Sequence, residues 1–204
     1  MRKIIFLDID GVLSPRWWNS DKQSDNYGCL FDAKAVANLA KIVEETDAEI
    51  VISSSWKDMG LVELQNMWRD RDLPGKIVDI TPDYMSDELL LKEDSADMDY
   101  LYERGSEIQG WLLLHGDDVS RYVIIDDMDD ILPEQKSHFV QTDPEVGITE
   151  EDVDKAVRLL NNYESIKYIG LAPRPQRRVD KENHVARQSG ARPRAHRCHP
   201  LFRS

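Results

Sequence analysis

Three groups of oxygen-bearing side chains come directly after apolar runs in the sequence. Asp8 and Asp10, separated by one residue, follow the first run, three serines at 53–55 follow the second, and Asp126 and Asp127 follow a third. Crowded carboxylates repel one another unless a cation neutralises them, and Mg²⁺ prefers carboxylate, carbonyl, water and phosphate oxygens. Serine hydroxyls and exposed backbone N–H groups bind phosphate oxygens well. These residue types favour metal-assisted chemistry on a phosphate group.

Each motif taken alone also has a purely structural explanation. Asp-Gly at positions 10–11 is a common turn signal, a serine run is often a turn or helix cap, and an aspartate pair is often a solvated loop. Three such motifs at the ends of three predicted strands are harder to explain as turns. Their coincidence favours one shared site.

Apolar runs and helical periodicity predict alternating strands and helices. Short β-branched runs predict buried strands at residues 3–9, 49–52, 76–80, 121–125 and 138–141. Apolar residues at helical spacing predict helices at residues 33–45, 61–71, 106–114 and 149–162. This alternation predicts a three-layer, Rossmann-like α/β fold with a parallel sheet of about five strands and helices on both faces. In such sheets, ligands bind at the carboxyl ends of the strands.

The composition of the chain changes sharply near residue 173. The whole chain has 41% hydrophobic and 32% charged residues, a balance typical of globular proteins. Residues 173–204 carry nine Arg or Lys against two Asp or Glu and have no hydrophobic period. We expect one domain at residues 1–172, followed by a basic, Pro/Arg-rich tail at 173–204 that is disordered. An arm for anionic partners is the alternative for this tail.

The net charge and the cysteine content bound the partners and the compartment. The net charge is −13, and the basic tail makes the body more acidic still. An acidic surface repels polyanions, so nucleic acid must be bound through local basic groups or the tail. Cys29 and Cys198 are too few for a disulfide scaffold, and no apolar run approaches the roughly 18 residues that span a bilayer. We expect a cytoplasmic protein without a membrane partner, and the sequence carries no signature of its oligomeric state.

The three motifs resemble those of a known superfamily. Residues 6–13 (FLDIDGVL), 51–56 (VISSSW) and 124–127 (IIDD) resemble the first, second and fourth motifs of the haloacid dehalogenase (HAD) phosphohydrolases. Two further stretches, 104–112 and 139–149, resemble the HAD-like domain found in Swiss army knife RNA repair proteins and their stand-alone relatives. The resemblance covers nearly the whole body and excludes the tail.

The resemblance implies roles for the catalytic side chains. It implies that Asp8 attacks phosphorus and forms an aspartyl-phosphate, and that Asp10 protonates the leaving oxygen and later activates water. It implies that Ser53 and the backbone N–H of Ser54 hold the transferring phosphoryl group.

The resemblance also implies a metal ion. Mg²⁺ is expected to be held by the Asp8 carboxylate, the Asp10 backbone carbonyl and Asp126, with Asp127 in support. The metal inverts the preference of the acidic pocket from cation to phosphate.

The third motif departs from the usual pattern of the superfamily, in which a Lys near a helix start neutralises the nucleophile and the phosphate. Arg104, near the predicted helix at 106–114, is the best candidate, and Lys57 and Lys92 compete with it. Arg keeps the positive charge and can bind phosphate through two parallel hydrogen bonds.

The segment after the first motif bears on the substrate. Residues 14–30 are too few for a large cap domain, and in the superfamily such capless members often accept extended substrates. Trp17 and Trp18 are candidates for binding substrate by stacking on a base or another ring. The alternative is that they pack on or close over the site.

The sequence therefore predicts a Mg²⁺-dependent phosphomonoester hydrolase. Its substrate is a phosphorylated small molecule, such as a nucleotide, or the terminal phosphate of a nucleic acid. The alternative is a non-enzymatic phosphate-binding or receiver-like module, which also uses an acidic pocket and Mg²⁺. Asp10 separates the two, because a second carboxylate serves hydrolysis of the intermediate and a binding module does not need it.

Overall fold

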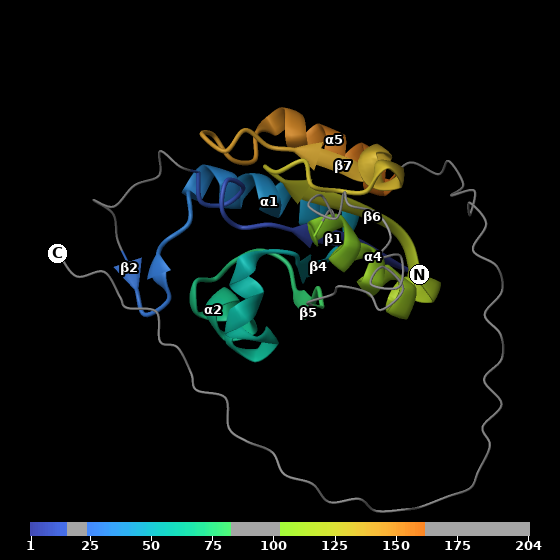
Figure 1. Cartoon of the computed structure of the whole chain (residues 1–204). Helices are drawn as coiled ribbons and strands as arrows, with labels where there is room; N and C mark the ends of the chain where they lie inside the picture. The colour runs from blue at the N-terminus through green and yellow to red at the C-terminus, as the bar shows by residue number, and fades with distance from the viewer. Residues whose placement is uncertain (16–23, 83–102, 162–204) are drawn as a thin grey trace, which may run out of the picture. The chain divides into compact units, whose positions relative to one another are not determined.

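A five-stranded parallel sheet positions the candidate site residues. The computed structural model of the chain describes residues 1–15, 24–82 and 103–161. The strand order is β5-β4-β1-β6-β7, and every neighbouring pair is parallel (Figure 1). The strands are β1 Arg2–Leu7, β4 Glu49–Ile52, β5 Ile77–Ile80, β6 Val119–Asp126 and β7 Phe139–Gln141. The predicted three-layer α/β fold is confirmed.

Helices cover both faces of this sheet. Three of them pack their apolar stripes on one face, and one packs on the other. The first three are α1 Ala33–Thr46, α2 Leu61–Asp70 and α5 Glu150–Asn161, and the fourth is α4 Glu103–His115. Figure 1 shows α1 and α5 side by side. Within the described residues, three short 3₁₀ helices connect the elements, η1 Ser55–Met59, η3 Gly116–Asp118 and η4 Pro133–His138.

Strand β1 is buried on both faces, which explains its almost unbroken apolar sequence. Ile5 and Leu7 join the larger core under α1, α2 and α5, whereas Ile4 and Phe6 join the smaller core under α4. Successive side chains of a strand point to opposite faces, so a strand at the centre of a three-layer fold needs apolar residues at every position.

The register of β1 aligns the carboxyl ends of the three central strands. Leu7 lies opposite both Ile52 of β4 and Ile125 of β6. The backbone pairing continues one residue further, because the N–H of Asp8 donates to the carbonyl of Ile125 (3.0 Å) and the N–H of Ser53 donates to the carbonyl of Leu7 (2.9 Å). Residues that follow these strands therefore meet at one edge of the sheet.

This edge contains the topological switch point of the sheet. From β1 the chain proceeds to β4 and β5 on one side, and then returns to place β6 and β7 on the other side. Ligands of open α/β sheets bind in the crevice outside the strand ends at such a point. Asp8 follows β1 and Asp126 ends β6, so both lie at the switch point.

Local capping explains where two of the helices begin. Asp32 accepts a hydrogen bond from the N–H of Ala35 (2.8 Å) before α1, as an N-cap residue does. Thr149 and Asp152 bond each other's backbone N–H groups before α5, at 3.3 and 2.8 Å. These reciprocal hydrogen bonds fix the start of α5 at Glu150.

Some boundaries and one element differ from the sequence-based expectations. Strand β1 ends at Leu7 rather than residue 9, and α4 begins at Glu103 rather than residue 106. Part of the segment expected to be a polar loop forms a hairpin of β2 Ser24–Asp25 and β3 Gly28–Cys29. A hydrogen bond within the turn stabilises it, since the Asp25 side chain accepts from the N–H of Tyr27 (2.8 Å).

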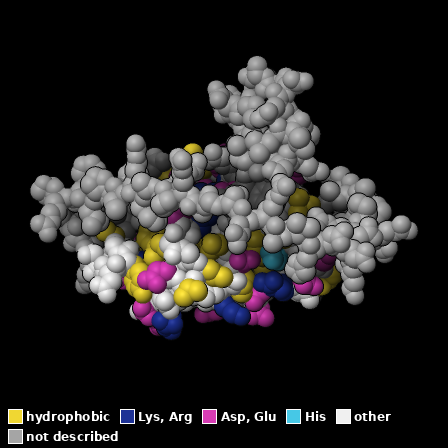
Figure 2. All heavy atoms as spheres, turned by 60° about the horizontal axis from the view of Figure 1, so that its bottom comes forward, with side chains coloured by type: hydrophobic (Ala, Val, Ile, Leu, Met, Phe, Trp, Pro, Cys, Tyr) yellow, Lys and Arg dark blue, Asp and Glu magenta, His cyan; other side chains and the backbone are white. Residues whose placement is uncertain are grey.

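Several predictions fall on residues that the structure does not describe. Trp17, Trp18, Lys92 and the tail at 173–204 lie outside the described residues, and the domain boundary at 172 stays a prediction. Among the described helices, none combines the length and the apolar character needed to cross a membrane. Figure 2 shows the face that carries α2 and β5, where the described acidic and basic side chains are interspersed with hydrophobic ones.

Candidate active site

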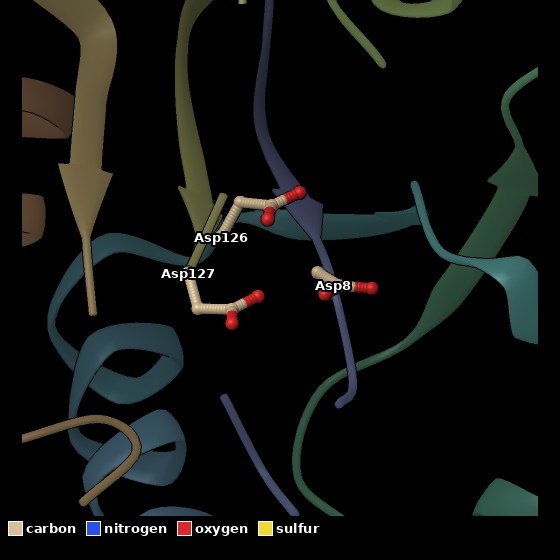
Figure 3. A group of neighbouring side chains, drawn as sticks. All are labelled: Asp8, Asp126 and Asp127. Carbon is tan, nitrogen blue, oxygen red and sulfur yellow. The ribbon is translucent and has the colours of Figure 1, made fainter. Parts of the chain in front are cut away.

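Three carboxylates gather at the switch point of the sheet. Asp8 follows β1, Asp126 ends β6 and Asp127 comes next, and one carboxylate oxygen from each lies within 4.8 Å of the other two. Figure 3 shows Asp126 and Asp127 projecting from the end of β6 towards the side of Asp8. Asp8 and Asp126 are buried, with 6% and 1% of their surface exposed. This arrangement concentrates negative charge where water cannot screen it well.

The electrostatics of this group oppose full ionisation. Burial raises the pKa of the Asp8 carboxyl, although Arg104 and a hydrogen bond from Ser54 act in the opposite direction. Burial, which is the larger cause, and the charge of Asp8 together raise the pKa of Asp126 to about 8. Oxygen Oδ2 of Asp126 is buried and accepts no hydrogen bond from the described residues. Three carboxylates this close together fit a hard divalent cation, which would neutralise them.

Arg104 supplies the positive charge that already faces these acids. Its Nε lies 3.2 Å from Oδ2 of Asp126, and its Nη2 lies 3.8 Å from Oδ1 of Asp8. The side chain is 18% exposed, so part of the guanidinium remains accessible. Lys57 forms a salt bridge with Glu107 instead. Of the two candidates for the third motif that the structure describes, Arg104 contacts the acidic cluster.

The first turn of α4 is held tightly, and this holds Arg104 in place. The N–H of Gly105 donates to the carbonyl of Asp130 (3.0 Å), which follows β6. The buried amide of Gln135 donates to the carbonyl of Gly105 (2.9 Å) and accepts from the N–H of Leu132 (3.0 Å). A Cβ atom at residue 105 would lie 2.5 Å from the nitrogen of Leu132, so only glycine permits this approach.

The three serines after β4 lie in different environments. Ser53 and Ser54 are buried, and the hydroxyl of Ser54 hydrogen-bonds the Asp8 side chain and accepts from the N–H of Trp56 at 3.5 Å. The Ser53 hydroxyl has no hydrogen-bond partner among the described residues. Ser55 is exposed and lines the cavity beside Asp8. The predicted phosphate-binding roles of Ser53 and Ser54 stay predictions.

Asp10 lies apart from the three clustered carboxylates. Its side chain is exposed, and its Oδ2 accepts a hydrogen bond from Nε1 of Trp56 (3.1 Å). Its carboxylate is not one of the group that Asp8, Asp126 and Asp127 form. It nevertheless borders the same cavity as Asp8. Asp10 therefore shares the cavity with Asp8 and Asp127, but its carboxylate lies outside the group that could hold a metal ion.

An open cavity of about 450 Å³ gives a ligand access to several of these side chains. It is lined by Asp8, Asp10, Gly11, Ser14, Pro15, Ser55, Arg104, Asp127 and Met128. Asp126 is not among the lining residues, because it lies behind Arg104 with almost no exposed surface. A phosphate group in the cavity would meet Asp8 and Arg104 together.

Sequence reasoning gave no site role to four of the lining residues, which are Gly11, Ser14, Pro15 and Met128, and it named Ser55 only as part of the serine run. Gly11 could have been found from the Asp-Gly turn signal. It has φ +76°, and a Cβ atom there would lie 2.6 Å from Cγ of Asp127. Ser14, Pro15 and Met128 have no local signal, because their place at the cavity depends on how the loops after β1 and β6 approach one another.

The fold and the site together define a Rossmann-like α/β protein with an acidic, cation-compatible centre at the carboxyl edge of its sheet. The family model for the HAD domain in Swiss Army Knife RNA repair proteins matches residues 4–153, and the chain belongs to this family. No curated protein matches the chain. The family match confirms the resemblance seen in the motifs, and it implies phosphohydrolase chemistry in general and the general use of a metal ion.

The close approach of Gly11 to Asp127 predicts the effect of Gly11→Ala. Alanine at a positive φ costs about 1 kcal/mol of the free energy of unfolding. The added methyl group also collides with the Asp127 carboxylate, so the loss should exceed this amount. Urea denaturation measures it. Gly60→Ala is the matched control, because Gly60 has φ +82° and nothing within 4 Å of the added Cβ. Equal losses in the two variants would contradict this reading.

The raised pKa of Asp126 predicts a pH-dependent gain from Asp126→Asn in chelator. Between about pH 4 and 8 the folded state retains a proton on Asp126 that the unfolded state has lost, so stability falls as pH rises through this window. Asparagine has no such proton. The variant should therefore be more stable than the wild type by at least about 1 kcal/mol near pH 8, with the difference shrinking towards pH 4. Thermal unfolding over this pH range measures it, with the exposed Asp117→Asn as the control. A difference that does not change with pH contradicts the prediction.

Proposed function

We propose that the protein is a Mg²⁺-dependent phosphomonoester hydrolase that works through an aspartyl-phosphate on Asp8. The observation that supports this most strongly is the cluster of Asp8, Asp126 and Asp127 oxygens within 4.8 Å, beside Arg104 and an open cavity. A structural acidic cluster has no need of an arginine and an opening. A site that binds a phosphate between a cation and a nucleophile needs both.

The reaction has two steps in this proposal. In the first, a carboxylate oxygen of Asp8 bonds to phosphorus while the bond from phosphorus to the leaving oxygen breaks, and Asp10 gives that oxygen a proton. In the second, Asp10 takes a proton from water, and this water attacks the phosphorus of the aspartyl-phosphate. Phosphate departs, and the Asp8 carboxylate and the protonated Asp10 are restored.

The remaining residues hold the reactants. Arg104 binds the equatorial phosphoryl oxygens and offsets the charge of Asp8, to which its Nη2 lies close (3.8 Å). The Ser54 hydroxyl orients the Asp8 carboxylate through a hydrogen bond. Bound Mg²⁺, held by Asp8 and Asp126 with Asp127 in support and with the Asp10 backbone carbonyl as a further ligand, would neutralise the carboxylates and polarise the phosphoryl group.

We propose the terminal phosphate of a nucleic acid or a nucleotide as the substrate. The family is named for RNA repair proteins, and the described residues line a cavity that is open to solvent. Arg104 is the only Arg or Lys among the described residues that line the cavity, so this lining offers one basic group for a terminal phosphate and no row of basic groups for a backbone. This favours recognition of the chain end over recognition of a long duplex. The cytoplasmic location stays a prediction.

An aryl phosphate assay with and without Mg²⁺ tests the proposed reaction. Asp8→Asn should abolish turnover, because the amide is not a nucleophile, and chelation should do the same. Asp10→Asn should reduce kcat by about 10²- to 10⁴-fold, because the water that attacks the aspartyl-phosphate then lacks its general base, whatever the leaving group was. Asp117→Asn, an exposed acid on η3, is the control and should retain full activity.

The same assay separates an enzyme from a phosphate-binding or receiver-like module. Such a module would accept a phosphoryl group on Asp8 without multiple turnover. Equal turnover by the wild type and both active-site variants would refute the mechanism. A panel of nucleotides, sugar phosphates and 3′- or 5′-phosphorylated oligonucleotides then identifies the substrate, and a preference for sugar phosphates would contradict the proposed class.

A further inference from the structure

Trp56 contacts the one candidate catalytic carboxylate that lies outside the acidic cluster. It belongs to η1, directly after the serine run, and its Nε1 donates to Oδ2 of Asp10 (3.1 Å). The Asp10 side chain is exposed, and an exposed carboxylate on a turn has several rotamers open to it. A hydrogen bond from a rigid ring selects one of them.

The Trp56 ring is itself held by a chain of contacts. Phe31 is buried, and its ring meets the ring of Trp56 edge-on, with centroids 5.5 Å apart and an interplanar angle of 64°. The guanidinium of Arg71 lies 4.7 Å from the centroid of Phe31, and it bonds both carboxylate oxygens of Asp25 at 2.8 Å. The β2–β3 hairpin and the end of α2 therefore support the ring that reaches Asp10.

We propose that Trp56 is a positioning residue that fixes the proton-transferring atom of Asp10. This inference rests on the proposed function, in which Asp10 is the general acid. An indole N–H can only donate, and the carbonyl oxygen of a protonated carboxyl is a better acceptor than its hydroxyl oxygen, so the bond to Oδ2 favours the proton on Oδ1. The transferable proton is therefore carried by Oδ1. Trp56 thus determines which oxygen of Asp10 serves the leaving group.

A series of phosphate esters with different leaving groups tests this inference. A general acid matters most when the leaving group is a poor one, such as an alkoxide, and least for an activated aryl oxide. Trp56→Phe keeps a ring against Phe31 and removes the N–H. We expect it to lower kcat/KM, which reports the step that expels the leaving group, by about 10-fold on alkyl phosphates, a fraction of the full general-acid effect, with little change in kcat/KM on an activated aryl phosphate.

Trp68→Phe is the matched control. Trp68 also packs near Phe31, with ring centroids 6.4 Å apart, but its Nε1 donates to the carbonyl of Pro74 (2.9 Å). A loss that is purely structural would affect all esters equally in both variants. A leaving-group dependence in Trp56→Phe that matches that of Trp68→Phe would overturn the inference.

The double variant separates this inference from the proposed function. If Trp56 acts through Asp10, then Trp56→Phe has no further effect in the Asp10→Asn background, and additive losses overturn the inference. If Asp10→Asn shows no leaving-group dependence, the general-acid role of Asp10 fails instead, and the inference fails with it.

Indole N–H resonances give a second readout that does not require Trp56→Phe to fold. The chain has five tryptophans. In a ¹H–¹⁵N spectrum of full-length protein, Asp10→Asn should shift the indole signal of Trp56 and leave that of Trp68 unchanged. An unchanged Trp56 signal would show that the hydrogen bond is absent in solution, which would overturn the inference.

Discussion

The register of the parallel sheet is the constraint on which the site depends. Leu7 pairs with Ile52 on one side and Ile125 on the other, so three strands end level with one another. A shift of one residue in either pairing would turn Asp8 or Asp126 towards the opposite face, because side chains alternate along a strand. Such a shift would exchange Ile5 and Leu7, which pack in one core, with Ile4 and Phe6, which pack in the other, and the different shapes of these side chains oppose it. The same burial that stabilises the fold therefore fixes the position of the chemistry.

The buried acids of the site lower the stability of the folded state. Asp8 and Asp126 are buried within reach of each other, and Arg104 offsets only part of their repulsion, since the pKa of both acids remains raised. Groups held in this way are typical of functional sites, because a stable structure alone would not select them. A bound cation would relieve the repulsion between these carboxylates, and metal binding would then stabilise the folded state. The tight contacts around Gly105 and Gln135 hold the arginine that moderates the repulsion.

Sequence patterns predicted the sheet, its layers and the acidic strand ends because these depend on periodicity and on residue type. Family resemblance also ranked Arg104 ahead of Lys57 and Lys92 for the third motif, and Arg104 lies beside Asp8 and Asp126. Sequence patterns could not find the hydrogen bond from Trp56 to Asp10, or the place of Met128 at the cavity, since both depend on how separate loops meet in space. The β2–β3 hairpin was missed because its strands have two residues each, too few for an alternating pattern, and because Arg71, the C-cap of α2, bonds Asp25 from a distance in sequence.

In the proposed mechanism, one cation and one phosphoryl group bind together at the acidic cluster, which lies at the switch point of the sheet, and Asp8 is the nucleophile. Anomalous diffraction from crystals grown with Mn²⁺ and beryllofluoride, an analogue of a phosphoryl group, tests it most directly. We expect beryllium to be bonded to an Asp8 oxygen and a metal peak to lie about 2.0–2.2 Å from oxygens of Asp8 and Asp126. Beryllium on another carboxylate, or a metal peak away from these two side chains, would contradict it.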